Sequence, residues 1–347
     1  MNILVIRFRQ MGDAILATVV LNTLRQNFPE ATIDFVLNER LAPLFSDHPS
    51  IDHIVTFTDD ERHHALTYVR KVWQTVRRRH YDVIIDMRST MNTALFALLS
   101  PTTRYRIGIQ KAYTRLMFNY RKAMSSKENM IDHNLGLLAP LNQLKPLMLC
   151  RQFSLAITTD EVAAFGRYMN QCGVDANRPV CLVGVTAKLA SKRWDEGRMA
   201  WVLRRLLERY PTLQLIFNYA PGEEAGHARN VWQQLDRSPR VFMDVQAKSP
   251  RELYAMAHHV CMYFGNEGGA RHIVHAAGVP SYVIMAPGNN KERWLPQNDT
   301  PAEGIASTDF LDDEELATMT RQQQYDVITQ ERVCEGLFLF IDHHKIL

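Results

Sequence analysis

Short apolar runs alternate with amphipathic segments along most of the chain. In the first part of the sequence these runs lie at 2–8, 32–37, 54–57, 81–87 and 105–109. Segments with the helical spacing of apolar residues separate most of them, and a second series of the same kind runs from 179 to 285. Strands that alternate with helices form parallel sheets that helices cover on both faces. The sequence therefore predicts an α/β protein.

The length of the chain and the break between the two series predict two domains. The chain has 347 residues, and a soluble domain has about 150. The alternation blurs after residue 110 and begins again at Pro179. We expect a Rossmann-like domain over 1–160, a second one over 161–325 that faces it across a cleft, and a C-terminal helix over 326–347 that packs back toward the N-terminal domain.

Composition excludes several other classes of protein. Hydrophobic residues make up 46% and charged residues 22% of the chain, which is typical of a soluble globular protein, and no apolar run approaches the roughly 20 residues that span a bilayer. The formal charge of +3 is too small to indicate nucleic-acid binding. The five cysteines are scattered and form no CxxC pair, so neither a disulfide framework nor a zinc site is predicted. We therefore expect a cytoplasmic protein without a nucleic-acid partner.

A loop with several cations follows the predicted strand at 179–185. It contains Thr186, Lys188 and Lys192. Ligands of doubly wound sheets bind outside the carboxyl ends of the strands, where cations and hydroxyls suit a pyrophosphate. The alternative is a solvated loop with Trp194 packed onto the core. The residues alone leave both interpretations open.

A turn with two glycines follows the predicted strand at 260–264. Gly268 and Gly269 let a phosphate approach the backbone closely, and the helix that begins there offers free N–H groups to an anion. His272 lies about one turn into this helix. His275 shares its face, but no further ligand completes a metal site. We expect this turn to bind an anion without a metal.

Carboxylates follow two other predicted strands. Asp13 stands in the turn after the first strand, where it either complements the dipole of the next helix or acts as a general base. Glu223 and Glu224 follow the strand at 213–217, where a carboxylate accepts ribose hydroxyls or starts a helix. The first turn lacks a GxGxxG motif, so we expect no dinucleotide cofactor.

In several segments the chain resembles glycosyltransferase family 9, the bacterial heptosyltransferases of lipopolysaccharide core assembly. The specific segments are the opening NILVIRFRQMGDAILATVVLNTLRQNFP and the later NEGGARHIVHAAGVP. The loop with Lys192-Arg193-Trp194 and the glutamate loop match more loosely. The resemblance covers almost the whole chain. It implies the GT-B fold, in which two Rossmann-like domains face each other across a cleft.

The same resemblance implies roles for individual residues. Asp13 matches the family's catalytic aspartate, and Lys192 matches the lysine that contacts the donor phosphate. The remaining matches concern the donor, with Glu223 or Glu224 as the ribose ligand and Gly268, Gly269 and His272 in the donor-binding segment.

The chain also departs from the family pattern near the donor. Glu267, Gly268 and Ala270 replace the family's aspartate, serine and proline, and Lys188 and Arg271 are additional cations. These changes are compatible with a diphosphate site and leave the donor sugar open.

The resemblance implies an inverting glycosyltransferase that needs no metal or other cofactor. Its donor is ADP-heptose or a related nucleotide sugar, its acceptor an anionic glycolipid of the lipopolysaccharide core, and its general base Asp13. Such an acceptor implies peripheral contact with the cytosolic face of the inner membrane. The alternative is a non-catalytic protein of the same fold that binds nucleotide sugars.

Cations that suit an anionic acceptor occur in the N-terminal half. The stretch from 104 to 127 has seven cations and no acid, which steers anions toward it or simply forms a solvated face. The acceptor-binding residues that we expect are Arg9, Arg104, Arg106, Arg115 and Arg121.

Overall fold

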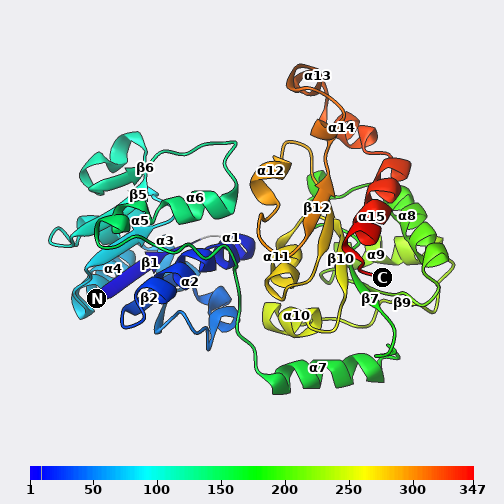
Figure 1. The fold of residues 1–347 in the computed structure, drawn as a ribbon, viewed down its shortest axis with the longest axis horizontal. Coiled ribbons are helices and arrows are strands. Elements are labelled where there is room, and N and C mark those ends of the chain that lie inside the picture. Colours follow the sequence, from blue (N-terminus) through cyan, green and yellow to red (C-terminus); the bar gives the residue numbers. More distant parts are fainter. Residues whose placement is uncertain (9) are drawn as a thin grey trace. The chain divides into compact units, whose positions relative to one another are not determined.

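The computed structural model describes residues 1–8 and 10–347. Within this part the chain divides into two compact units, Met1–Ala156 and Ile157–Leu347 (Figure 1). The division lies close to the boundary that the sequence predicted after residue 160. Arg9, which we expected to contact an acceptor, lies outside the described residues.

The first unit contains a parallel sheet in the order β3-β2-β1-β4-β5-β6. Its central strands are buried almost throughout, as expected for a parallel sheet with both faces covered. Five strands match predicted runs, and the short β6 was missed because it lies where the alternation blurs. The strands are β1 (Asn2–Ile6), β2 (Thr32–Asn38), β3 (His53–Phe57), β4 (Val83–Asp86), β5 (Tyr105–Ile109) and β6 (Tyr120–Lys122).

Helices connect these strands. The α-helices are α1 (Met11–Leu16), α2 (Thr18–Asn27), α3 (Asp59–His63), α4 (Ala65–Arg78), α5 (Met91–Leu98) and α6 (Met130–Gly136). Three 3-10 helices also occur in this unit: η1 (Glu39–Phe45), η2 (Ala112–Leu116) and η3 (Ala139–Gln143).

The segment between the first two apolar runs forms two helices, which are divided at Ala17. The Thr18 hydroxyl donates a hydrogen bond to the Ile15 carbonyl at 2.7 Å. Threonine side chains that bond to a carbonyl one turn back compete with the helical ladder and bend it. The structure accordingly ends α1 at Leu16 and begins α2 at Thr18. This break leaves Asp13 in a short helix of its own.

The second unit repeats this architecture. Its sheet has the order β12-β11-β10-β7-β8-β9, again with all pairs parallel. The strands are β7 (Val180–Gly184), β8 (Gln214–Phe217), β9 (Val241–Phe242), β10 (Met262–Asn266), β11 (Ser281–Ile284) and β12 (Ala302–Ile305). The helices are α7 (Thr159–Gln171), α8 (Glu196–Arg209), α9 (Glu223–Gln234), α10 (Pro250–Ala257), α11 (Gly269–Ala276), α12 (Lys291–Trp294), α13 (Asp313–Thr318), α14 (Arg321–Val327) and α15 (Gln330–His344), with 3-10 turns η4 (Ala190–Lys192) and η5 (Ser307–Asp309).

The two sheets share one strand topology, and it places the candidate residues. The chain order reverses between β1 and β4 in the first sheet and between β7 and β10 in the second. At such a point successive loops leave the sheet in opposite directions, so ligands of doubly wound folds bind there at the carboxyl ends of the strands. The turns after β1, β7 and β10, which carry most of the predicted site residues, all lie at these two points.

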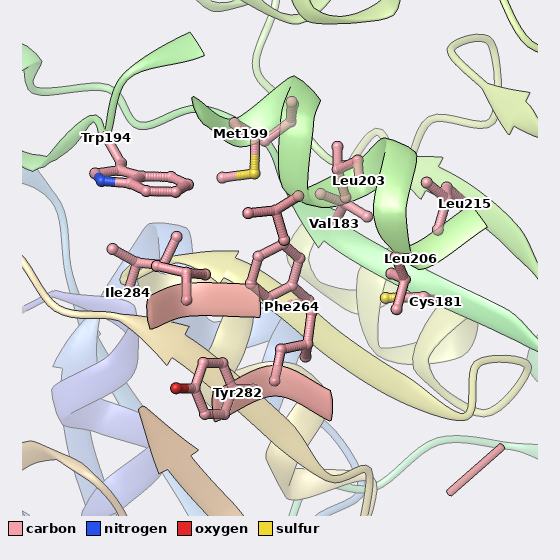
Figure 2. Close-up of a cluster of buried hydrophobic side chains, with 14 of the residues drawn as sticks. Cys181, Val183, Trp194, Met199, Leu203, Leu206, Leu215, Phe264, Tyr282 and Ile284 are labelled. Carbon is pink, nitrogen blue, oxygen red and sulfur yellow. The ribbon is translucent and has the colours of Figure 1, made fainter. Parts of the chain in front are cut away.

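The core of the second unit lies between its sheet and the helices beside it. Figure 2 shows Trp194, Met199 and Leu203 together with Phe264 and Ile284 in one buried cluster. Trp194 is 1% exposed, and full burial of a large apolar side chain contributes about 1.5–3 kcal/mol. Trp194 therefore packs onto the core, which was part of one of the two interpretations of its loop.

The last helix, α15, belongs to the second unit. It packs against α8, β11 and β12, and Figure 1 shows it in red beside α8. The rings of Phe340 and Tyr282 lie 5.7 Å apart at this contact. The expectation that the terminal helix approaches the N-terminal domain stays a prediction.

None of the helices in the described part of the chain is long and apolar enough to cross a membrane. Contact with a membrane surface stays a prediction.

Candidate active site

Asp13 lies in the first turn of α1, just beyond the carboxyl end of β1, and it is 7% exposed. Its Oδ1 accepts a hydrogen bond from Arg7 Nη2 at 2.7 Å, and the two groups form a buried ion pair. Arg7 Nη1 donates in addition to the Met87 carbonyl. Among the described residues, Asp13 Oδ2 has no hydrogen-bond partner. The pair therefore fixes the carboxylate and leaves one oxygen available for a ligand.

Sequence reasoning did not identify Arg7 as the partner of Asp13. The signal was a cation directly after the first strand and six residues before the aspartate. A side chain that points inward from this position is buried, and a buried charge requires a partner. The turn between β1 and α1 brings the two groups together.

A second buried carboxylate, Asp86, organises the neighbouring strand end. It is the last residue of β4, and its Oδ1 accepts hydrogen bonds from the backbone N–H of Arg88 at 2.9 Å and of Ser89 at 2.7 Å. Burial raises the pKa of Asp86, against the opposing effect of these N–H groups. Ser89 Oγ in turn accepts from Ile109 N–H at 2.7 Å. Asp86, which sequence reasoning missed, thus ties the ends of β4 and β5 beside the Asp13 turn.

The structure does not gather the predicted acceptor-binding cations at one place. Arg104 precedes β5 and Arg106 is its second residue, whereas Arg115 lies on η2 beyond the carboxyl end of that strand. Arg121 lies on β6, in register with Gly108. A strand of this length spans about 15 Å. Arg115 and Arg121 are therefore the two nearer the edge that carries Asp13, and the acceptor roles of all four stay predictions.

In the second unit, Asn266 holds two loops together. Its side chain is buried; Oδ1 accepts from the Trp194 backbone N–H at 2.8 Å and Nδ2 donates to the Gly184 carbonyl at 2.9 Å. The backbones of β7 and β10 are so close that a Cβ on Gly265, whose φ is +135°, would lie 2.4 Å from the Gly184 oxygen. Asn266 therefore joins the loop that follows β7 to the turn that follows β10.

Lys192, the predicted phosphate contact, is paired with a carboxylate of the same site. Its Nζ lies 2.5 Å from Glu267 Oε1. Glu267 also accepts a hydrogen bond from Asn289. The Lys192 side chain is 40% exposed and that of Glu267 10%. The structure thus brings Lys192 next to the β10 turn, but with much of its charge compensated by Glu267.

Gly268 and Gly269 begin α11, as predicted. Gly268 is the N-cap in an extended conformation, and the space where its Cβ would point is open. A serine, the residue usual in the family segment, therefore fits there without strain. The free N–H groups and the dipole at this helix start are suited to an anion. The binding of an anion here stays a prediction.

The other two predicted residues of the β7 loop lie in different environments. Thr186 is buried, and its hydroxyl has no hydrogen-bond partner in the described part of the chain. Lys188 is exposed. Buried hydroxyls are normally hydrogen-bonded, so Thr186 is the better placed of the two to receive a ligand.

His272 and Arg271 are neighbours on α11 and both are buried, with exposed fractions of 8% and 2%. Arg271 Nη2 lies 3.1 Å from His272 Nε2 and also donates to the Trp294 carbonyl at 3.0 Å. Burial lowers the pKa of His272 well below its ordinary value, and Arg271, His275 and Lys192 lower it further. His272 is therefore a neutral imidazole next to a buried cation. Its Nδ1 has no partner among the described residues.

His275 contacts Asn298, and it does not belong to a group of metal-ligating side chains in the described part of the chain. Its Nε2 lies 2.9 Å from Asn298 Oδ1. Burial lowers the pKa of His275 to about 4. In the described chain, the group of side chains that could jointly hold a metal ion lies elsewhere, at Glu303, His343 and His344 on the surface.

The two candidate ribose glutamates differ in their contacts. Glu223 Oε1 lies 3.5 Å from Arg193 Nη1 and 3.3 Å from His227 Nε2, and the pKa of Glu223 is lowered by His227 and by Arg193. Glu224 accepts a hydrogen bond from the Ala220 backbone N–H at 3.2 Å, a local contact at the start of α9. Of the two, Glu223 faces the loop that carries Lys192. This contact favours Glu223 as the ligand-binding residue.

Comparisons with known proteins identify relatives of the chain. The family model described as glycosyltransferase family 9 (heptosyltransferase) matches residues 69–301. Lipopolysaccharide heptosyltransferase 3 of Escherichia coli K12 is 23% identical over 294 residues, which cover 78% of each chain. Asp13 lies before the range that the family model matches.

Solved structures of similar fold include a member of glycosyltransferase family 9 from Veillonella parvula. Its TM-score is 0.80 at 17% identity, and the match covers 98% of this chain and 97% of that one. The E. coli heptosyltransferase WaaC with ADP-2-deoxy-2-fluoro heptose has a TM-score of 0.68 at 14% identity, over 97% and 99% of the two chains. These likenesses confirm the predicted α/β class with two Rossmann-like units.

Proposed function

Because the chain belongs to glycosyltransferase family 9 (heptosyltransferase), it is a glycosyltransferase, and we propose that it transfers a heptose or related sugar from ADP-heptose to an anionic acceptor of the lipopolysaccharide core. The support is the family match, the curated relative named for lipopolysaccharide and the fold shared with an enzyme that holds an ADP-heptose analogue. Family membership also argues against the non-catalytic alternative.

The reaction that we propose is one inverting displacement at the anomeric carbon. An acceptor hydroxyl attacks this carbon, its proton passes to Asp13 Oδ2, and the bond from the carbon to the diphosphate oxygen breaks. Because Arg7 holds Oδ1 at 2.7 Å, the carboxylate keeps one orientation. A general base needs such placement before it needs a tuned pKa.

Negative charge develops on the departing diphosphate, and residues of the second unit are suited to stabilise it. The N–H groups of Gly268 and Gly269 at the start of α11, His272 and Lys192 are the proposed contacts. Hydrogen-bond donors that are already in place before the reaction lower the barrier without reorganisation. Glu223, with Arg193 beside it, is the proposed ribose ligand.

The observation that carries the base assignment is the buried Asp13 carboxylate, with one oxygen fixed by Arg7 and the other without a partner among the described residues. The test is Asp13→Asn, which keeps the shape and removes the proton acceptor. We expect transfer to fall about 10²–10⁴-fold, the usual contribution of a general base, while ADP binding persists. The measurement is transfer rate together with a thermal-shift titration of ADP.

Asp34→Asn is the matched control for this variant. Asp34 is also a buried carboxylate of the first unit, and its Oδ2 accepts from the Tyr81 hydroxyl at 2.6 Å. It lies near the amino end of β2, away from the proposed site. A transfer rate in Asp13→Asn equal to that of Asp34→Asn would refute the base assignment.

The nucleotide is tested separately with the unmodified chain. A ligand that binds only the folded state raises the melting temperature by mass action. We expect ADP to stabilise the second unit and UDP and GDP to leave it unchanged. Equal stabilisation by all three nucleotides would contradict an adenine-specific donor.

A further inference from the structure

The contact between Arg271 and His272 defines the protonation of the histidine ring. A guanidinium carries only N–H donors and has no acceptor. Since Arg271 Nη2 lies 3.1 Å from His272 Nε2, Nε2 must present its lone pair to Arg271. The remaining ring proton is then on Nδ1. The geometry thus selects one of the two neutral tautomers and disfavours the imidazolium.

The charged and titratable groups around the ring act in the same direction, with one exception. The other cations that face it are Lys192 on η4 and, when protonated, His275 on α11. Tyr263 on β10 and Glu267 after it lie near Arg271. Glu267 is the exception, because its negative charge favours protonation, but Lys192 and Asn289 already engage its carboxylate. Arg271 Nε and Nη1 have no hydrogen-bond partner in the described part of the chain.

We propose that Arg271 is a positioning residue that holds His272 as a neutral imidazole with its proton on Nδ1, so that this N–H donates to an oxygen of the donor's diphosphate. The identity of the ligand rests on the proposed function; the tautomer rests on the Arg271 contact alone. His272 Nδ1 is buried without a partner among the described residues, and a buried donor calls for an acceptor. An anionic oxygen that follows the N–H groups of Gly268 and Gly269 is such an acceptor.

This arrangement makes the histidine a donor whose state does not follow pH. An ordinary histidine changes charge between about pH 5 and pH 8. Next to a fixed guanidinium, the neutral ring persists through this range and Nδ1 keeps its proton. Arg271 also places a positive charge close to where the leaving diphosphate becomes more negative.

The tautomer is tested by nitrogen NMR of the full chain labelled with ¹⁵N-histidine. His272→Gln identifies the His272 signals by their disappearance. In the unmodified chain we expect one neutral form with the proton on Nδ1 and no titration between about pH 5 and pH 8. A ring that titrates in this range, or one with its proton on Nε2, would overturn the proposal.

Arg271→Met removes the charge and the donor at similar length. Arg271 forms no ion pair with a carboxylate among the described residues, so the change leaves no buried countercharge without its partner, and thermal unfolding checks that the variant folds. We expect His272 to titrate, or to populate the form with its proton on Nε2, in Arg271→Met. Arg271→Lys keeps a cationic donor, so it restores the behaviour of the unmodified chain. Identical spectra for Arg271→Met and the unmodified chain would refute the positioning role.

ADP binding then tests the ligand. Calorimetry should show ADP affinity about tenfold or more lower in Arg271→Met, since a hydrogen bond to a charged group is lost or misdirected, with adenosine affinity unchanged. If Arg271→Met alters the tautomer but leaves ADP affinity unchanged, the contact with the diphosphate is refuted and the positioning of the ring by Arg271 is not. A chain that binds no ADP at all would contradict the proposed donor and leave the NMR result to decide the tautomer.

Discussion

The carboxyl edges of the two sheets have the same strand topology but opposite electrostatic character. At the first edge, the charges are paired inside the unit: Arg7 compensates Asp13, and backbone N–H groups surround Asp86. At the second edge, donors outnumber acceptors, because Arg271 and His272 keep N–H groups without partners in the described chain. The first edge is thus suited to fix the orientation of a carboxylate, and the second edge to bind an anion.

This difference shows that a shared fold fixes where a site forms and not what it does. Both sheets bring turns to the point where the strand order reverses. The side chains in those turns then decide which ligand binds there. Substitutions that remove single charged or titratable side chains in the two units test this comparison.

The largest effect is expected when the cation of the first edge is removed. Arg7→Met leaves the buried Asp13 carboxylate uncompensated, and breaking a buried pair from one side costs about 3–5 kcal/mol. Arg271→Met in the second unit removes a cation that forms no ion pair with a carboxylate in the described chain, so it should cost far less. Urea unfolding followed by hydrogen exchange of β1 and β10 measures each unit. The double variant Arg7→Met/Asp13→Asn should recover much of the loss, and equal costs for both methionine variants would contradict the comparison.

Acid should weaken the second unit through His275. Its pKa is about 4 in the folded chain and about 6.5 when unfolded, so the unfolded state binds more protons between these values. Stability is therefore fully present above about pH 6.5 and is lost as the pH falls toward 4, by up to about 3 kcal/mol at 1.4 kcal/mol per pKa unit.

The control for this acid effect lies in the first unit. Burial lowers the pKa of His48 to about 4 as well. His275→Gln should reduce the pH dependence of unfolding in the second unit, where His272 and His258 also have lowered pKa values, while the first unit keeps its own. The readout for the second unit is tryptophan fluorescence, since four of the five tryptophans lie there. An unchanged slope in His275→Gln would show that other groups carry the acid sensitivity.

The smallest effect is expected for Lys192, a cation of the second edge that a carboxylate compensates. Glu267→Gln removes the carboxylate that pairs with Lys192 at 2.5 Å. The lysine is then free for an anion, and we expect ADP to bind a few-fold tighter, as fits a partly exposed pair worth at most about 1 kcal/mol. Calorimetry at low and high salt measures it. Glu224→Gln, which changes a glutamate with only a local backbone contact, is the matched control, and weaker binding in Glu267→Gln would reverse this view of Lys192.

The architecture was largely predictable because it depends on patterns that repeat. Buried parallel strands read as apolar runs and the helices between them as amphipathic segments. The rule that ligands bind at strand carboxyl ends located the turns of Asp13, Lys192 and Gly268. The helix break at Ala17 was not predicted because one hydroxyl, that of Thr18, decides it.

The pairing of charges within the site was less predictable. The sequence names the cations but not their partners, and Lys192 meets a glutamate that lies 75 residues away. The acceptor stretch poses the reverse difficulty: its cations are neighbours in sequence, but Arg104 and Arg106 lie at the amino end of β5 and Arg115 lies beyond its carboxyl end. Contacts between distant segments form only in the packed fold, so the periodicity of apolar residues along the chain does not predict them.

One contact of Trp194 also constrains the order in which the protein is completed during synthesis. The indole N–H donates to the Ile328 carbonyl at 3.1 Å, across 134 residues of chain. Arg198 donates to the same carbonyl at 3.2 Å. A growing chain leaves the ribosome from its N-terminus. The hydrogen bonds from Trp194 and Arg198 can therefore form only after residue 328 has emerged. The unit with Asp13 has all its residues at Ala156 and can fold while the rest is still being translated.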